Sequence, residues 1–255
     1  MNYLLLICSD GIPTADKGAT MRRELPAWVQ DTGERGVRVY GEQLAGPDVA
    51  KTVRVRDGET LVTDGPFLET KEFVAGFDIL DCADLDEAID IAARHPVSWF
   101  HMIEVRPFAT DPTNGDTRTF MADDSGRRDE LAARLAAPVA DGATRYLLTV
   151  CVDGIPKTEE VGAAIARDAE AWVAKMGARG VRAYGHALAH VDTATTVRVR
   201  DGERVLTDGP FIETKEFIGG FDLIDCAGID ETVAIAAAHP LARFHMIEVR
   251  PLAQA

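Results

Sequence analysis

The sequence predicts an α+β protein made of two tandem ferredoxin-like halves, each a βαββαβ unit with an inserted β-hairpin, that together form an intramolecular pseudo-dimeric α+β barrel. The first observation behind this prediction is an internal repeat. Residues 57–107 and 201–251 align without a gap and are identical at about two-thirds of their positions. The second observation is the order of apolar and turn-rich segments, which reads strand, helix, strand, hairpin, strand, helix, strand in both halves.

The repeat also predicts the division into domains. We expect one domain over residues 1–109, a linker with a short helix over 110–143, and a second domain over 144–255. Each domain is large enough for a core of its own. Two copies are too few for a solenoid, so we expect the domains to pack as the subunits of a homodimer do.

The first elements of each half follow from apolar runs and their boundaries. Residues 3–8 are a short continuous apolar run, which is typical of a buried strand. Residues 16–35 fit a helix, with Gly36 directly after its end. Pro26 lies inside this segment and is expected to kink the helix or delay its start. Residues 37–41 are predicted to form the second strand.

A hairpin and a third long strand come next. Residues 52–56 and 60–64 alternate in character around Asp57-Gly58, a dipeptide that favours tight hairpin turns. Residues 73–82 then form an apolar strand. In the second half, residues 144–251 repeat the whole order, so the same elements are expected there.

The last two elements are a helix and a strand. Acidic residues at 84–87 open the helix, where the helix dipole favours negative charge, and His95-Pro96 closes it. His95 and the matched His239 are expected to cap the helix end, where the dipole favours a proton. Residues 100–106 are the final strand. Helices on one face of such a sheet leave the other face bare, and the second copy is expected to cover it.

The linker differs in kind from the repeats. Residues 129–137 can form a short helix before Pro138 and Gly142 interrupt it. The linker is therefore expected to span the body of the protein, semi-rigid in its middle.

Composition excludes several classes of function. The chain has 255 residues and a formal net charge of −15, which disfavours nucleic-acid partners. The four cysteines occupy matched places in the repeats and form no C-x-x-C pair, so we expect free thiols in the cytoplasm. No segment is long enough to span a membrane, and the apolar start is too short for a secretory signal.

Three short motifs occur in both halves and carry a family resemblance. They are "DGPFLETKE" (64–72) and "DGPFIETKE" (208–216), "TVRVRDGE" (52–59 and 196–203), and "IEVRP" (103–107 and 247–251). They resemble the signature of the DGPF family, a branch of the YCII-related proteins. The resemblance covers both halves but not the linker. It implies a ferredoxin-like fold and a dimeric barrel, here with both partners on one chain.

The resemblance implies less about function. DGPF proteins are often encoded near extracytoplasmic-function sigma factors, which suggests a regulatory link. Some YCII-related proteins look like cofactor-free enzymes with a histidine in the first helix and a nearby aspartate. The first helices here contain no histidine around Trp28 or Trp172, so that pair of residues is not carried over.

Acid–base candidates cluster at the DGPF turn. Asp64 and Asp208 begin the turn, and Glu69 and Lys71 follow it in the first half, as Glu213 and Lys215 do in the second. A carboxylate beside an ammonium group can act as a base with a tuned pKa. The alternative is a tight turn whose residues are purely structural, with a solvated charge cluster or hairpin salt bridge beside it.

Binding candidates share one face of the last strand. Alternation places an aromatic, a thioether, an acid and a guanidinium on the same side, which resembles a pocket lining. They are Phe100, Met102, Glu104 and Arg106, and in the second half Phe244, Met246, Glu248 and Arg250. Arg106 can hold a carboxylate or phenolate by paired hydrogen bonds. The alternative is an internal Glu104–Arg106 ion pair at the barrel interface.

One position differs between the halves in a way that matters for chemistry. His186 replaces Glu42, and a histidine there is a candidate acid–base group. The alternative is an inert histidine on the surface. A metal site is not expected, because His101 and Glu104 are three residues apart on a strand and point to opposite faces.

Two functions remain open. The first is a cofactor-independent isomerase or lyase acting on a small anionic or aromatic molecule by acid–base chemistry. The second is a non-catalytic ligand-binding or regulatory module, and a variant of the first has only one active half. In each case we expect a small-molecule partner and no cofactor; whether the chain oligomerises further is left open.

Overall fold

The computed structural model describes residues 1–9, 11, 15–67, 72–109, 128–152, 158–212 and 216–253. The first half contains β1 (Asn2–Ser9), α1 (Ala15–Glu34), β2 (Arg38–Gln43), β3 (Lys51–Arg56), β4 (Glu59–Asp64), β5 (Phe73–Asp81), α2 (Leu85–Arg94) and β6 (Met102–Pro107). After α3 (Arg128–Ala136), the second half contains β7 (Thr144–Val152), α4 (Glu159–Ala178), β8 (Arg182–Ala187), β9 (Thr195–Arg200), β10 (Glu203–Asp208), β11 (Phe217–Cys226), α5 (Ile229–Ala237) and β12 (Met246–Pro251).

Each half builds the ferredoxin-like sheet that the sequence predicted. In the first half the spatial order is β6-β1-β5-β2, and in the second it is β12-β7-β11-β8, with all neighbours antiparallel. This is the arrangement of a βαββαβ unit whose first and third strands lie in the centre of the sheet.

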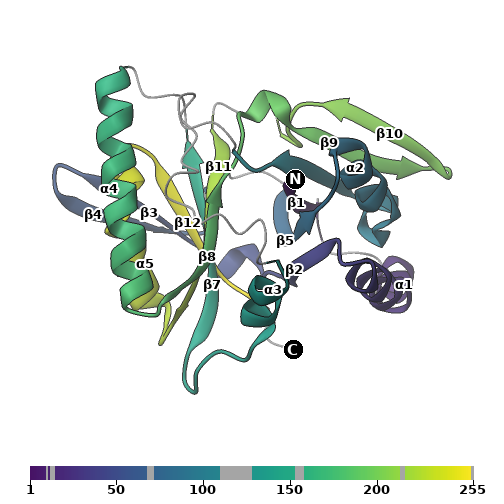
Figure 1. Ribbon diagram of the computed structural model, residues 1–255, viewed down its shortest axis with the longest axis horizontal. Coiled ribbons are helices and arrows are strands. Elements are labelled where there is room, and N and C mark those ends of the chain that lie inside the picture. Colours follow the sequence, from purple (N-terminus) through teal and green to yellow (C-terminus); the bar gives the residue numbers. More distant parts are fainter. Residues whose placement is uncertain are drawn as a thin grey trace.

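The two hairpins are exchanged between the halves, which the sequence did not indicate. The β3–β4 hairpin of the first half joins the second sheet, where Val53 pairs with Ile247. The β9–β10 hairpin of the second half joins the first sheet, where Val197 pairs with Ile103. Figure 1 shows each hairpin beside elements of the opposite colour range. The turn itself is as predicted, because Asp57 and Gly58 both have positive φ angles (52° and 81°).

The two sheets face each other and close into a barrel. Leu44 after β2 bridges to Leu252 after β12, and Phe108 after β6 bridges to Leu188 after β8. Apolar side chains from both sheets fill the interior as one cluster, including the rings of Tyr40, Phe77, Phe108, Tyr184 and Phe221. The predicted intramolecular pseudo-dimeric barrel is therefore confirmed.

The paired helices cover the outer face of each sheet. Trp28 of α1 is buried there and donates from Nε1 to the Ile91 carbonyl of α2 at 3.2 Å, and Trp172 makes the matching bond to Ile235 at 3.3 Å. The helix begins at Ala15, so Pro26 inside it does not delay its start. Tertiary packing of the apolar face stabilises the helix more than one lost hydrogen bond destabilises it.

The last strand of the first half begins two residues later than predicted. A 3₁₀ helix over Pro96–Trp99 follows α2, and the amides of Phe100 and His101 both donate to the Val97 carbonyl at 3.0 and 2.8 Å. These bonds hold Phe100 in a turn, so β6 starts at Met102 and Phe100 does not share the strand face of Glu104.

Helix α3 of the linker closes one end of the barrel. Its Leu131 and Leu135 are buried in the interior cluster beside Tyr40 and Tyr184. Arg145, at the start of β7, donates to the Leu135 carbonyl. In Figure 1, α3 lies in the lower centre of the picture, between the two halves. Among the described residues, we find no helix that is long and apolar enough to span a bilayer.

Candidate functional site

A buried carboxylate–guanidinium pair lies inside the barrel in each half. Arg106 donates from Nη1 to Oε1 of Glu104 at 3.0 Å, and from Nη2 to the Ala189 carbonyl at 2.6 Å. The two side chains are 1 and 2% exposed. In the second half, Arg250 bonds to Glu248 and donates to the Val74 carbonyl at 2.6 Å. The internal ion pair, one of the two readings of this motif, is therefore present.

The DGPF turn of one half completes the pair of the other half. The Phe211 amide donates to Oε2 of Glu104 at 3.0 Å, and the Phe67 amide donates to Oε2 of Glu248 at 3.1 Å. Gly65 adopts φ 93°, a value that favours glycine, and this turn directs the Phe67 amide inward. Both oxygens of each glutamate are thus bound, one by a guanidinium and one by a backbone amide from across the barrel.

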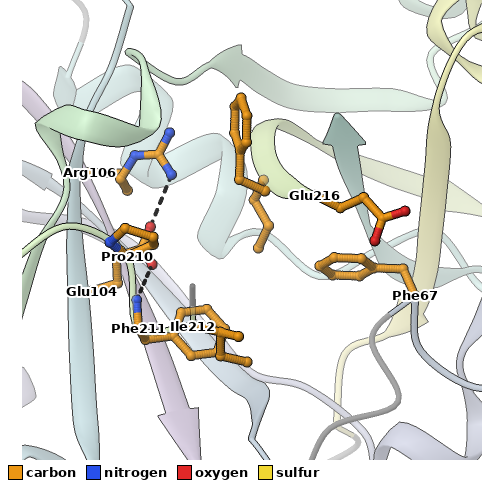
Figure 2. Close-up of a pocket in the computed structure, with 9 residues that line it drawn as sticks. Phe67, Glu104, Arg106, Pro210, Phe211, Ile212 and Glu216 are labelled. Atoms are coloured by element: carbon orange, nitrogen blue, oxygen red, sulfur yellow. Dashed lines mark hydrogen bonds and ion pairs between the residues drawn. The ribbon is translucent and has the colours of Figure 1, made fainter. Parts of the chain in front are cut away.

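A small cavity borders each pair. Each holds about 20 Å³, which is room for one water molecule. The walls are largely aromatic and aliphatic. Around the first pair they include Phe67, Pro210, Phe211, Phe217 and Ile218, and around the second Pro66, Phe67, Phe73, Phe211 and Ile218. Figure 2 shows the Glu104–Arg106 pair and Phe211 on one side of the first cavity, facing Phe67 and Glu216.

The Nε nitrogen of each guanidinium has no acceptor in the described part of the chain. Nε of Arg106 and Nε of Arg250 are buried and have no hydrogen-bond partner among the residues that the structure describes. A buried donor without an acceptor costs about 1–3 kcal/mol. The same two arginines line the cavities.

The methionines of the predicted binding face, Met102 and Met246, lie two residues before the glutamates on the same strands. Met102 is buried, and Arg198 of the exchanged hairpin donates to its Sδ at 3.1 Å. Met246 is contacted by Arg54 in the same way. Burial raises the pKa of the neighbouring Cys8 and Cys151 thiols well above their ordinary value, so both are protonated. Neither methionine lines either of the two cavities described above, whereas the acid and the arginine of each pair do.

The catalytic candidates at the DGPF turn lie elsewhere. Asp64 is 85% exposed at the end of β4, where it pairs with Lys51 across the hairpin. Asp208 is likewise exposed at the end of β10. Neither aspartate lines the cavities beside the two ion pairs. Glu69, Lys71, Glu213 and Lys215 lie outside the described residues.

The two phenylalanine candidates also lie away from the cavities. Phe100 is contacted by Lys17 of α1, whose Nζ is 5.7 Å from the ring centre. Phe244 is 45% exposed. The unmatched His186 is buried on β8 and stacks on Phe108, with ring centres 4.5 Å apart. Its Nδ1 lies 2.8 Å from the Ala187 carbonyl.

Sequence reasoning missed a second buried polar cluster, on the helix side of each sheet. Asp78 of β5 accepts from Arg38 Nε at 2.6 Å, and His95 Nε2 lies 3.9 Å from its other oxygen. Burial raises the pKa of Asp78 to about 6, although the charge of Arg38 opposes this. Gly41 leaves room for the cluster, because a Cβ there would be 1.9 Å from Asp78 Oδ1.

The histidine of this cluster is neutral, contrary to the expectation from the helix dipole. Burial, and then the charge of Arg38, lower the pKa of His95 to about 3. Its Nδ1 accepts from the Val97 amide at 3.1 Å, and its ring meets Trp28 edge-on at 4.4 Å. The His95 side chain therefore caps the start of the 3₁₀ helix with an unprotonated nitrogen, and not the end of α2 with a protonated one as the sequence predicted. His239 repeats the arrangement, with a pKa also lowered to about 3 by burial and Arg182.

A signal for this cluster was present in the sequence. Both copies keep Gly-Phe-Asp (76–78 and 220–222), a tryptophan in the first helix and His-Pro after the second. These residues are identical in two copies that differ elsewhere, which singles the positions out. The sequence did not show, however, that the three segments come into contact in the fold.

Comparisons with known proteins agree with the internal repeat. A model of the YCII-related domain matches residues 1–109 and 147–254. An uncharacterised protein of Rhizobium meliloti (strain 1021) is 38% identical over 117 residues, which are 93% of that protein and 43% of this chain. A crystal structure of a putative chlorite dismutase aligns over 99% of this chain and 94% of its own, with a TM-score of 0.43 and 10% identity. The family match covers most of both halves, and the chain therefore belongs to the YCII-related domain family, with one copy of the domain in each half.

Proposed function

We propose that the chain binds a small aromatic molecule that carries an oxygen acceptor, at the cavities beside Glu104–Arg106 and Glu248–Arg250. The observation that carries this proposal is the buried Nε donor of each arginine, which has no acceptor among the described residues and belongs to a residue that lines a cavity. A ligand oxygen there would satisfy the donor, and the surrounding phenylalanines would contact an aromatic ring.

The charge of the site selects among ligands. Glu104 and Glu248 already neutralise their arginines at hydrogen-bond distance. A second carboxylate would approach an occupied guanidinium beside an existing negative charge, at a considerable desolvation cost. A neutral acceptor such as a carbonyl or a phenol avoids that cost. Of the two ligand classes expected from the sequence, the aromatic class is therefore favoured over the anionic class.

The test is a binding titration with small probes. 4-Fluorophenol, benzamide and benzoate are titrated into the full chain and followed by calorimetry and by ¹⁹F or ¹H NMR. The neutral probes are expected to bind more tightly than benzoate, and the double variant Arg106→Met/Arg250→Met is expected to lose at least about tenfold in affinity, the cost of one hydrogen bond. Arg23→Met, which changes an exposed arginine of α1, serves as the control. The proposal is contradicted if wild type binds none of the probes at millimolar concentration, or if the double variant binds them as tightly as the Arg23→Met control does.

Proton transfer is the second candidate function, of the isomerase or lyase type. It is favoured by the position of Glu104 and Glu248, whose buried carboxylates border the cavities. The carboxylate with a near-neutral pKa, Asp78, belongs to the helix-side cluster and does not line either cavity. Exchange of ligand C–H protons with D₂O, measured by NMR and compared with Glu104→Gln/Glu248→Gln, tests this function. Exchange that persists unchanged in the double variant contradicts it.

A further inference from the structure

We infer that the two cavities are coupled, so that one ligand bound beside one ion pair weakens binding beside the other. This inference rests on the proposed function, because it concerns the regulation of the same site. It is carried by the way in which Phe67 and Phe211 are shared between the cavities.

The cavities share part of their walls. Phe67, Phe211 and Ile218 line both of them. The two phenylalanines belong to opposite halves of the chain and are matched positions of the DGPF turn. A wall that serves two cavities cannot move away from one without moving toward the other.

The same two residues also hold the ion pairs through their backbones. The Phe67 amide binds Glu248 at 3.1 Å, and the Phe211 amide binds Glu104 at 3.0 Å. Each phenylalanine is thus fixed to one glutamate by its amide while it lines both cavities. Displacing Phe67 to enlarge the first cavity strains the hydrogen bond that orients the carboxylate of the second.

The size of the cavities makes such a displacement necessary. Each holds about 20 Å³, whereas a benzene-sized ring occupies a cavity of about 150 Å³ in an engineered protein. An aromatic ligand must therefore push the shared walls outward. Packed interiors have low compressibility and transmit strain, so we expect the space gained at one ion pair to be lost at the other.

Coupling of this kind is expected to weaken the second binding step by about 5- to 150-fold, the usual range for coupled sites. The test is a ¹⁹F NMR and calorimetric titration of the full chain with 4-fluorophenol. Wild type is expected to bind one equivalent first and the second only at much higher concentration. Arg250→Met, which lacks one donor, is expected to show one step with the affinity of the first.

Phe67→Leu provides a second variant, because it keeps the backbone amide and an apolar side chain but removes the bulk of the shared ring. The two steps are expected to approach each other in this variant. Two equal and independent steps in wild type would overturn the coupling and leave the proposed function standing. No binding of 4-fluorophenol, benzamide or benzoate to wild type would overturn both.

Discussion

The neutral, buried histidine of each half leads to a prediction about acid stability. His95→Asn replaces Nδ1 with an amide oxygen that can still accept from the Val97 amide, and it removes the titratable group. The variant also loses the contact with Trp28, which costs stability equally at every pH. The quantity of interest is therefore how the difference in unfolding free energy between wild type and His95→Asn changes with pH.

The sign and size follow from the pKa of His95, which falls from 6.5 to about 3 on folding. A depressed histidine pKa means that the unfolded chain takes up a proton first. The contribution of the neutral ring is fully present above pH 6.5 and is lost as the pH falls toward 3. Between pH 7.5 and pH 5.5 the loss is about 1.4 kcal/mol, since one pH unit below the unfolded pKa corresponds to about 1.4 kcal/mol. Asp78, whose raised pKa has the opposite sign, is present in both proteins.

The assay is urea unfolding at pH 7.5, 6.5 and 5.5, which stays above the isoelectric point near 4.8. The advantage of wild type over His95→Asn is expected to shrink by about 1.4 kcal/mol across this range. His239→Asn should reproduce the effect, and the double variant should show about twice the change, because the two clusters are separate. A difference that grows as the pH falls would mean a protonated histidine in the folded state, as the helix dipole alone predicts, and would refute the reasoning.

Three further outcomes test the packing around the site. Glu104→Ala should lower the unfolding free energy by about 3–5 kcal/mol in urea titrations, since it leaves Arg106 buried without its carboxylate partner. Glu104→Gln should lower the unfolding free energy clearly less. Equal losses of stability in the two variants would contradict an ionised pair. Gly41→Ala should destabilise the chain in thermal unfolding, because its Cβ would lie 1.9 Å from Asp78 Oδ1. The control Gly177→Ala, on the open surface of α4, should stabilise the chain by about 0.5–1 kcal/mol. A Gly41→Ala variant as stable as wild type would mean that the cluster around Asp78 is loosely packed. Leu131→Ala should cost about 2–5 kcal/mol in urea titrations if α3 closes the barrel, and a loss below about 1 kcal/mol would mean that the linker helix only rests on it.

The strand order of each half could be predicted because local signals and the repeat agreed. Apolar runs marked β1 and β7, and Asp57-Gly58 marked the hairpin turn. The exchange of hairpins could not be predicted, since a hairpin that pairs with β6 and one that pairs with β12 have the same local sequence. Which sheet it joins depends on the distance that the connections span after folding.

The candidate site was predicted in part. Alternation along the last strand placed Glu104 and Arg106 on one face, and the structure brings both to a cavity. The sequence pattern could not show that the DGPF turns contact the buried glutamates through the Phe67 and Phe211 amides. Every residue except proline has a backbone amide, so the residue types do not reveal which amide donates. Asp64, the titratable residue of the motif, drew attention for its charge, yet it faces solvent.

The exchanged hairpins also set the order in which the chain can complete its structure. Strand β3 pairs with β12 through residues 51–53 and 247–249, so the second sheet is finished only after residues 247–249 have been synthesised. Until then the β3–β4 hairpin lacks its neighbour and leaves Val53, which is fully buried in the finished fold, uncovered. Joining both halves in one chain makes this late pairing a unimolecular step with a high effective concentration. Its rate is therefore independent of the concentration of the protein, because the pairing does not require an encounter with a second chain.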